Sequence, residues 1–231
     1  GTIYRKDGKL MDISIFEAVG PLMIGPSSSH TAGAARLGRA GAAIVTEPFL
    51  RVSFGLYGSF AKTYKGHGTD IALVAGVLGM EEDEEELRDA FTIARSRGLT
   101  FDFYEAELEG MHENSVKMTF YTDSGKEREI IGSSIGGGQI LICAIDGFPV
   151  QMRLNTNTLF VLQDDRKGVI YRITRILARN GINIGTMTVT REEKGARACC
   201  VIETDSLIGE DALSEIRNVE YVHQAQAIKI D

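Results

Sequence analysis

The chain has 231 residues, with 25 Lys and Arg against 32 Asp and Glu, which gives a formal net charge of −7 at pH 7. This length is enough for two modest domains or one large one, and the acidic balance argues against nucleic acid as a partner. No apolar run approaches the roughly 20 residues that span a bilayer, and no signal segment opens the sequence. We therefore expect a soluble, cytoplasmic protein without a membrane partner.

The first predicted element in chain order is a helix over the Ala/Gly-rich segment 30–45. Ahead of it, residues 1–10 lack hydrophobic periodicity, and we interpret them as leader residues or as residues added for expression before a start at Met11. We leave them out of the predicted fold.

A run of hydroxyl side chains directly precedes this helix, where Ser27, Ser28, Ser29 and Thr31 flank His30. Ser and Thr are favoured N-cap residues, the first helical turn leaves backbone N–H groups without partners, and the helix dipole favours negative charge there. Three serines exceed what a cap needs, so the run predicts a site for a carboxylate or phosphate beside a titratable histidine. A plain capped surface helix is the alternative interpretation.

Mixed helix and strand patterns continue to about Asn155. The predicted strands are 50–57, 99–105, 116–122, 127–133 and 139–145, and the predicted helices are 69–79 and 84–97. Helices on one side of a mainly antiparallel sheet form an α+β arrangement. We assign this first domain to residues 12–152, and expect its boundary in 146–155, which contains Gly147 and Pro149.

The second half, residues 156–231, has a different order of elements. It predicts strand 158–163, helix 168–180, strands 183–191 and 196–204, helix 209–216 and strand 221–230. This βαββαβ order is that of a ferredoxin-like domain, with two helices over a four-stranded antiparallel sheet.

A second candidate histidine, His67, lies between Gly66 and Gly68 and just ahead of a predicted helix that Thr69 could cap, with Asp70 following. Glycines let a backbone approach a ligand and would leave the imidazole exposed, and the pKa of histidine suits a general base. A loop histidine beside a glycine turn is the alternative. Two such histidines in one small domain favour a shared site.

The segment 133–139, which contains Gly136 and Gly137, lies between two predicted strands. It lacks the Lys-Ser/Thr ending of a phosphate-binding P-loop and no helix follows it. We interpret it as a hairpin turn or as a close approach of the backbone to a substrate.

The remaining candidate metal ligands are scattered. We interpret His112 and His223 as structural or solvent-exposed, and Cys143, Cys199 and Cys200 as buried thiols, since neighbouring residues of a strand point to opposite faces. No zinc or iron–sulfur pattern is present in this chain.

These motifs resemble the β subunit of the iron–sulfur-dependent, two-chain bacterial L-serine dehydratases. The matching segments are 14–21, 25–33, 56–59, 65–70 and 134–138. The resemblance implies a substrate-binding α+β domain followed by an ACT domain, and a lyase of amino-acid degradation and gluconeogenesis that converts L-serine to pyruvate and ammonia. It also implies a [4Fe–4S] cluster held by cysteines of a partner α subunit, without which this chain is inactive.

The resemblance also implies residue roles. His30 and His67 would face the cluster across the subunit interface, and we predict His67 as the base that takes the α proton and His30 as its orienting or proton-donating partner. The opposite assignment fits the sequence equally well. The implied substrate-binding residues are Ser27, Ser28, Ser29, Thr31, Gly66, Gly68, Thr69, Asp70, Gly136 and Gly137.

The ACT half departs from the serine-sensing ACT domains of phosphoglycerate dehydrogenases, whose loop after the first strand carries a His and an Asn. Gln163 and Asp165 stand at those positions here, and a carboxylate would repel the carboxylate of the ligand. Gly168 and Asn183 do match, so Asp165, Gly168 and Asn183 are candidate effector-binding residues. An amino acid, a cation or no ligand, and homodimerisation through this domain, all stay open. The alternative function is a regulatory, amino-acid-sensing subunit without catalytic residues.

Overall fold

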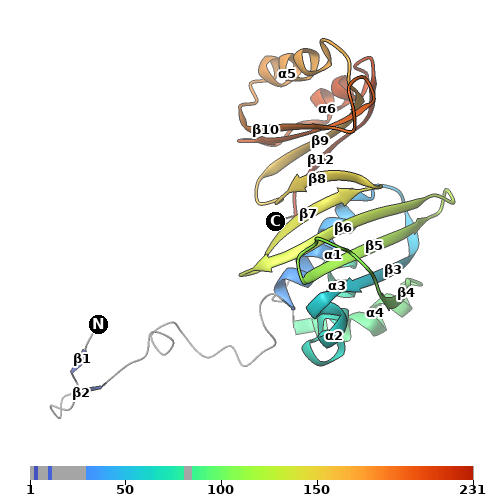
Figure 1. Ribbon diagram of the computed structural model, residues 1–231, viewed down its shortest axis with the longest axis vertical. Coiled ribbons are helices and arrows are strands. Elements are labelled where there is room, and N and C mark those ends of the chain that lie inside the picture. Colours follow the sequence, from blue (N-terminus) through green and yellow to red (C-terminus); the bar gives the residue numbers. More distant parts are fainter. Residues whose placement is uncertain (1–2, 5–9, 12–29, 81–84, 231) are drawn as a thin grey trace.

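The computed structural model describes residues 3–4, 10–11, 30–80 and 85–230. The first two ranges form a two-stranded antiparallel ladder of β1 (Ile3–Tyr4) and β2 (Leu10–Met11), which the sequence pattern had not indicated. The ladder lies apart from the two domains that make up the rest of the chain (Figure 1).

The first domain is built on a six-stranded sheet. Its strands are β3 (Phe49–Tyr57), β4 (Thr100–Glu105), β5 (Asn114–Thr122), β6 (Glu127–Gly136), β7 (Gln139–Ile145) and β8 (Phe148–Met152). They are ordered β4-β3-β5-β6-β7-β8, and every neighbouring pair is antiparallel except β3 and β4. The predicted mainly antiparallel sheet is confirmed.

Helices gather on one side of this sheet (Figure 1). They are α1 (Ala32–Ile44), α2 (Gly58–His67), α3 (Thr69–Val77), the 3₁₀ helix η1 (Glu85–Asp89) and α4 (Ala90–Ser96). The longest, α1, buries Leu37 and Ile44 against the sheet, where β5 contributes Met118 and Phe120. This arrangement confirms the α+β class.

Two glycines bring α1 and α3 into backbone contact. A Cβ atom on Gly76 would lie 1.9 Å from the carbonyl oxygen of Ala35, and one on Gly38 would lie 2.2 Å from that of Leu73. Side chains at these positions would force the helices apart. The small residues therefore fix where α1, which begins just after His30, sits over the domain.

Two elements of the first domain differ from the sequence expectation. Helix α2 was not predicted, because it buries only Phe60 and so lacks an apolar stripe. Strand β8 lies inside the expected boundary segment, where Gly147 and Pro149 were interpreted as linker residues. Proline is tolerated there because β8 is an edge strand, so its missing N–H is not needed in the ladder.

The second domain has the predicted βαββαβ order. Its elements are β9 (Asn157–Asp164), α5 (Val169–Arg179), β10 (Ile184–Arg191), β11 (Arg197–Thr204), α6 (Glu210–Arg217) and β12 (Val222–Ile228). The sheet order is β10-β11-β9-β12 with all neighbours antiparallel. The ferredoxin-like fold is confirmed. Strand β8 ends at Met152 and β9 begins at Asn157, so the expected end of the first domain at 152 and the expected start of the second at 156 enclose the link between these strands. The exact domain limits stay predictions.

The two faces of this second sheet bury different cores. Cys200 packs under α5 and α6, whereas Cys199 packs with Phe160 and Val201 against the core of the first domain. Burial raises the pKa of both thiols to about 12, as expected for buried cysteines, while Cys143 is only half-buried. The ACT-like domain is therefore docked on the first domain through an apolar sheet face (Figure 1).

Candidate functional site

Two histidines that are far apart in sequence lie against each other in the first domain. His30 immediately precedes the first turn of α1, and His67 is the last residue of α2. Their ring centroids are 4.8 Å apart with planes inclined by 48°. The structure thus brings together the two candidate catalytic residues.

His30 is the more deeply placed of the two rings, with 9 % of its surface exposed. Its Nε2 atom is hydrogen-bonded to the hydroxyl of Ser59 at 3.1 Å, and its ring packs on Phe60 at 5.6 Å. Burial lowers the pKa of His30, and repulsion by His67 lowers it further. His30 is therefore held as a neutral imidazole, fixed by Ser59.

Four buried polar atoms near these elements lack a hydrogen-bond partner within the described ranges. They are Nδ1 of His30, Nδ1 of His67, Oγ1 of Thr69 and Oγ of Ser134. Buried polar atoms in folded proteins nearly always have a partner. These four atoms lie on three neighbouring segments, and their free hydrogen-bonding capacity is what a small polar ligand needs to bind there.

Ser134 belongs to this site because its turn rests on α1. A Cβ atom on Gly33, in the first turn of α1, would lie 2.0 Å from the Ser134 hydroxyl. The turn between β6 and β7 continues through Gly136 and Gly137, both with positive φ, and the Gly138 carbonyl accepts a 3.5 Å hydrogen bond from Nη1 of Arg36. The glycine-rich segment is thus the predicted hairpin turn, and it also borders the histidine site.

The junction between α2 and α3 differs in detail from expectation. Thr69 does not cap α3: Gly68, at φ 70°, is the N-cap residue, and Thr69 is the buried first residue of the helix. Gly68 is needed for this left-handed turn between two helices, and Gly66 lies in the last turn of α2 rather than in a loop.

The exposure expected for His67 at this junction needs correction. His67 is half-buried rather than exposed, because it closes a helix. Asp70 is buried and accepts a hydrogen bond from the Ile71 amide at 2.9 Å, and burial raises the pKa of its carboxyl. Asp70 therefore stabilises the start of α3 and lies beside the site.

The hydroxyl run is represented in the described chain by Thr31, the N-cap residue of α1 beside His30. Ser27, Ser28 and Ser29 lie outside the described residues. Conversely, Ser59 and Ser134 were not assigned roles from the sequence. Each stands in a segment that the sequence analysis did single out, but only the fold brings them to His30 and Gly33.

The three candidate effector residues do not come together within one chain. Asp165 accepts hydrogen bonds from Nη1 of Arg191 at 3.0 Å and from the Gly195 amide at 3.1 Å, and the Gly195 amide followed by Arg191 lowers the pKa of its carboxyl. Asn183 donates a hydrogen bond to Asp205 at the opposite end of β10 from Arg191. The eight residues of β10 separate these two ends by about 25 Å. Gly168, at φ 86°, is the N-cap residue of α5.

The other histidines and the cysteines have structural surroundings. His112 is exposed and accepts a hydrogen bond from the Asn114 amide, and Nε2 of His223 forms a 2.7 Å hydrogen bond with the Asp164 carboxylate. Cys199 and Cys200 point into separate cores, so they cannot ligate one metal cluster. Across the described ranges, no three His, Cys, Asp or Glu side chains are placed to hold a metal ion.

Among the helices of the described ranges, none combines the length and the apolar character that crossing a bilayer requires.

Comparison with known proteins gives two family matches. Residues 14–97 match the family model described as serine dehydratase beta chain, and residues 157–221 match the ACT domain. A probable L-serine dehydratase beta chain of Bacillus subtilis is 39 % identical, over 93 % of this chain and 97 % of the relative. The L-serine dehydratase beta chain of Peptoniphilus asaccharolyticus is 37 % identical, over 96 % of this chain and 100 % of the relative. A D-3-phosphoglycerate dehydrogenase of Bacillus subtilis is 26 % identical, over 85 % of this chain but 37 % of the relative.

Proposed function

Because the chain belongs to the family of L-serine dehydratase beta chains, we propose that it contributes the acid–base half of an active site that converts L-serine to pyruvate and ammonia. The observation that carries this proposal is the pair of histidine rings 4.8 Å apart, each with a buried Nδ1 atom that has no partner within the described ranges.

The reaction needs a base for the weakly acidic α proton and assistance for the departure of the β-hydroxyl group. His67 takes the α proton, because it is the more accessible ring and ends a helix at the surface of the domain. His30 lies against it, neutral and hydrogen-bonded to Ser59, and orients it. Loss of the proton and of the hydroxyl group leaves an enamine, which rearranges to an imine that water hydrolyses to pyruvate and ammonia.

The substrate carboxylate is bound at the start of α1. The unpaired amides of a first helical turn and its dipole attract an anion, and Thr31 and the segment of Ser27–Ser29 precede that turn. The hydroxyls of Thr69 and Ser134 supply further hydrogen bonds to the polar groups of the amino acid.

The iron–sulfur cluster does not fit this chain, whose cysteines face separate cores or lie alone on β7. We place it on the partner alpha chain. The two histidines then approach it from this chain's side of a heteromeric interface.

The test is anaerobic pyruvate release from L-serine by this chain mixed with its candidate alpha chain, with each chain alone for comparison. His67→Ala should lower kcat by about 10²–10⁴, the usual range for loss of a general base. His112→Ala is the matched control, since His112 is an exposed histidine of the same domain, and it should retain full activity.

Two results would overturn the proposal. Near-wild-type kcat for His67→Ala would remove His67 from the chemistry. Full turnover by the alpha chain alone, changed only in degree by this chain, would establish the regulatory alternative instead.

A further inference from the structure

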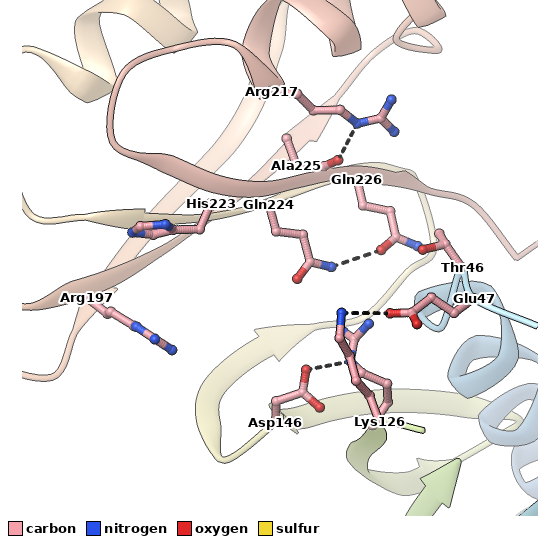
Figure 2. A pocket seen from close by; sticks show the side chains of 11 residues that line it. Thr46, Glu47, Lys126, Asp146, Arg197, Arg217, His223, Gln224, Ala225 and Gln226 are labelled. Carbon is pink, nitrogen blue, oxygen red and sulfur yellow. Dashed lines mark hydrogen bonds and ion pairs between the residues drawn. The ribbon is translucent and has the colours of Figure 1, made fainter. Parts of the chain in front are cut away.

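A pocket of about 900 Å³ lies between the two domains, far from the histidine pair, and is drawn in Figure 2. The first domain lines it with the segment after α1, the start of β6 and the β5–β6 and β7–β8 turns, and the ACT-like domain lines it with β11, β12 and the end of α6. The charged residues of its lining are Glu47, Lys126, Arg128, Asp146, Arg197, Arg217 and His223.

The lining has the opposite charge to the protein as a whole. Four Lys and Arg side chains face two carboxylates, and a third carboxylate, Glu210 just outside the lining, pairs with Arg217. One positive charge is left over before His223 is considered, in a chain of net charge −7. A concave surface with a local excess of one sign attracts ligands of the other sign. The expected ligand is therefore an anion.

The two carboxylates of the pocket are already occupied. Asp146 accepts hydrogen bonds from Nε of Arg128 at 2.7 Å and from the Glu129 amide at 2.8 Å. Glu47 accepts a hydrogen bond from the Ser124 hydroxyl and forms a 3.8 Å ion pair with Lys126. Neither carboxylate is left to bind a cation from solution.

Donors, by contrast, remain unused on both sides. The side chain of Arg197, on β11, is exposed and its guanidinium has no hydrogen-bonding or carboxylate partner among the residues the structure places. Arg128 is 9 % exposed, and its Nη2 atom is buried without an acceptor in the same part of the chain. A buried guanidinium nitrogen with unmet hydrogen bonds is costly unless something accepts them. This second observation, independent of net charge, also indicates an anionic ligand.

We propose that this pocket binds a small multivalent anion, a phosphate group or a polycarboxylate, that bridges the two domains. Arginine forks match the oxygen geometry of both ligand classes. An anion between Arg197 and Arg128 would connect β11 to β6 and hold the ACT-like domain on the first domain. The proposal does not depend on the catalytic roles of His30 and His67.

The experiment uses the full chain in calorimetric titration and thermal unfolding. Potassium phosphate and sodium citrate represent the two sources of the anion, sodium chloride at equal ionic strength controls for screening, and L-serine tests an amino-acid ligand. Phosphate or citrate should give a saturable heat of binding and should raise the Tm of the wild type more than that of the Arg197→Gln chain, because stabilisation by surface exclusion affects both chains equally. The anion that does so identifies the source.

Arg197→Gln is the diagnostic variant, because its side chain supports no described contact and the fold should survive its loss. We expect its affinity for the active anion to fall by about tenfold, the effect of one charge-assisted hydrogen-bonding group. Arg175→Gln makes the same change on α5, outside the pocket, and should bind as wild type does.

Three outcomes would overturn the proposal. They are Tm values in phosphate and citrate equal to the chloride control, a response to L-serine alone, or equal anion affinity in Arg197→Gln and wild type.

Discussion

Gly33→Ala tests the packing that places the glycine-rich turn on the candidate site. A Cβ atom at this position would lie 2.0 Å from the Ser134 hydroxyl and 2.7 Å from the Ser134 Cβ. Rotating the hydroxyl away relieves the first contact but not the second. The new methyl group must therefore push α1 and the β6–β7 turn apart.

The expected magnitude follows from two opposed effects. Overpacking of this kind costs about 1–3 kcal/mol, whereas Gly to Ala within a helix gains up to about 1 kcal/mol. We expect Gly33→Ala to lower the free energy of unfolding by about 1–2 kcal/mol, measured by urea denaturation of the full chain. The same shift of α1 should lower activity in the reconstituted complex, since α1 begins beside His30.

A double-mutant cycle with Ser134→Gly isolates the contact. Removing the Ser134 side chain should restore most of the loss, so the two substitutions together should cost less than their sum by at least about 1 kcal/mol. A Gly33→Ala chain as stable as wild type, or a strictly additive double variant, would refute the placement of Ser134 on α1.

Three further predictions follow from the same contacts. The pKa of His30 is lowered from 6.5 in the folded chain, so as the pH drops the unfolded chain binds a proton at His30 before the folded chain does. The free energy of unfolding should therefore fall as the pH drops below 6.5, by at most about 1.4 kcal/mol per pH unit. His30→Gln should flatten this part of the pH–stability curve, and an unchanged slope would contradict the prediction. Ser59→Ala should lower kcat and change KM little, because it removes the hydrogen-bonding partner of Nε2 of His30. A change in KM alone would indicate instead that Ser59 contacts the substrate. Gln226→Leu removes the 2.6 Å hydrogen bond from its Nε2 atom to the Ala43 carbonyl and should cost about 1–3 kcal/mol in unfolding, with faster amide hydrogen exchange in α1; unchanged exchange there would count against the domain contact.

Local sequence patterns predicted those helices and strands whose own residues carry the apolar period of the element. The ferredoxin-like half was predicted element by element because its helices have one apolar face and its central strands are short, largely apolar runs, as the burial of both Cys199 and Cys200 illustrates. The four α1-flanking hydroxyls and the glycines beside His67 likewise indicated a site directly. By contrast, α2 buries a single aromatic residue, and the helix propensity of its residues did not predict a helix.

What the sequence could not predict depends on contacts between distant segments. Strand β8 does alternate buried and exposed residues, with Phe148, Val150 and Met152 inward, but Pro149 and Gly147 hid that alternation behind turn signals. The hydrogen bond between Ser59 and His30 joins residues 29 positions apart. The interdomain pocket has no local motif at all, because Arg128 and Arg197 line one pocket only when the second domain docks.

The candidate active site and the interdomain pocket share one structural element, α1. Its first turn follows His30 and rests on Ser134, and its last turn offers the Ala43 carbonyl to Gln226 of β12. Thirteen residues of helix make a rigid rod of about 20 Å between these contacts. Its middle is held against α3 by Gly38 and Gly76, where backbone contact leaves little room to slide. A change in how the ACT-like domain docks must therefore either strain α1 along its length or move the end that carries His30.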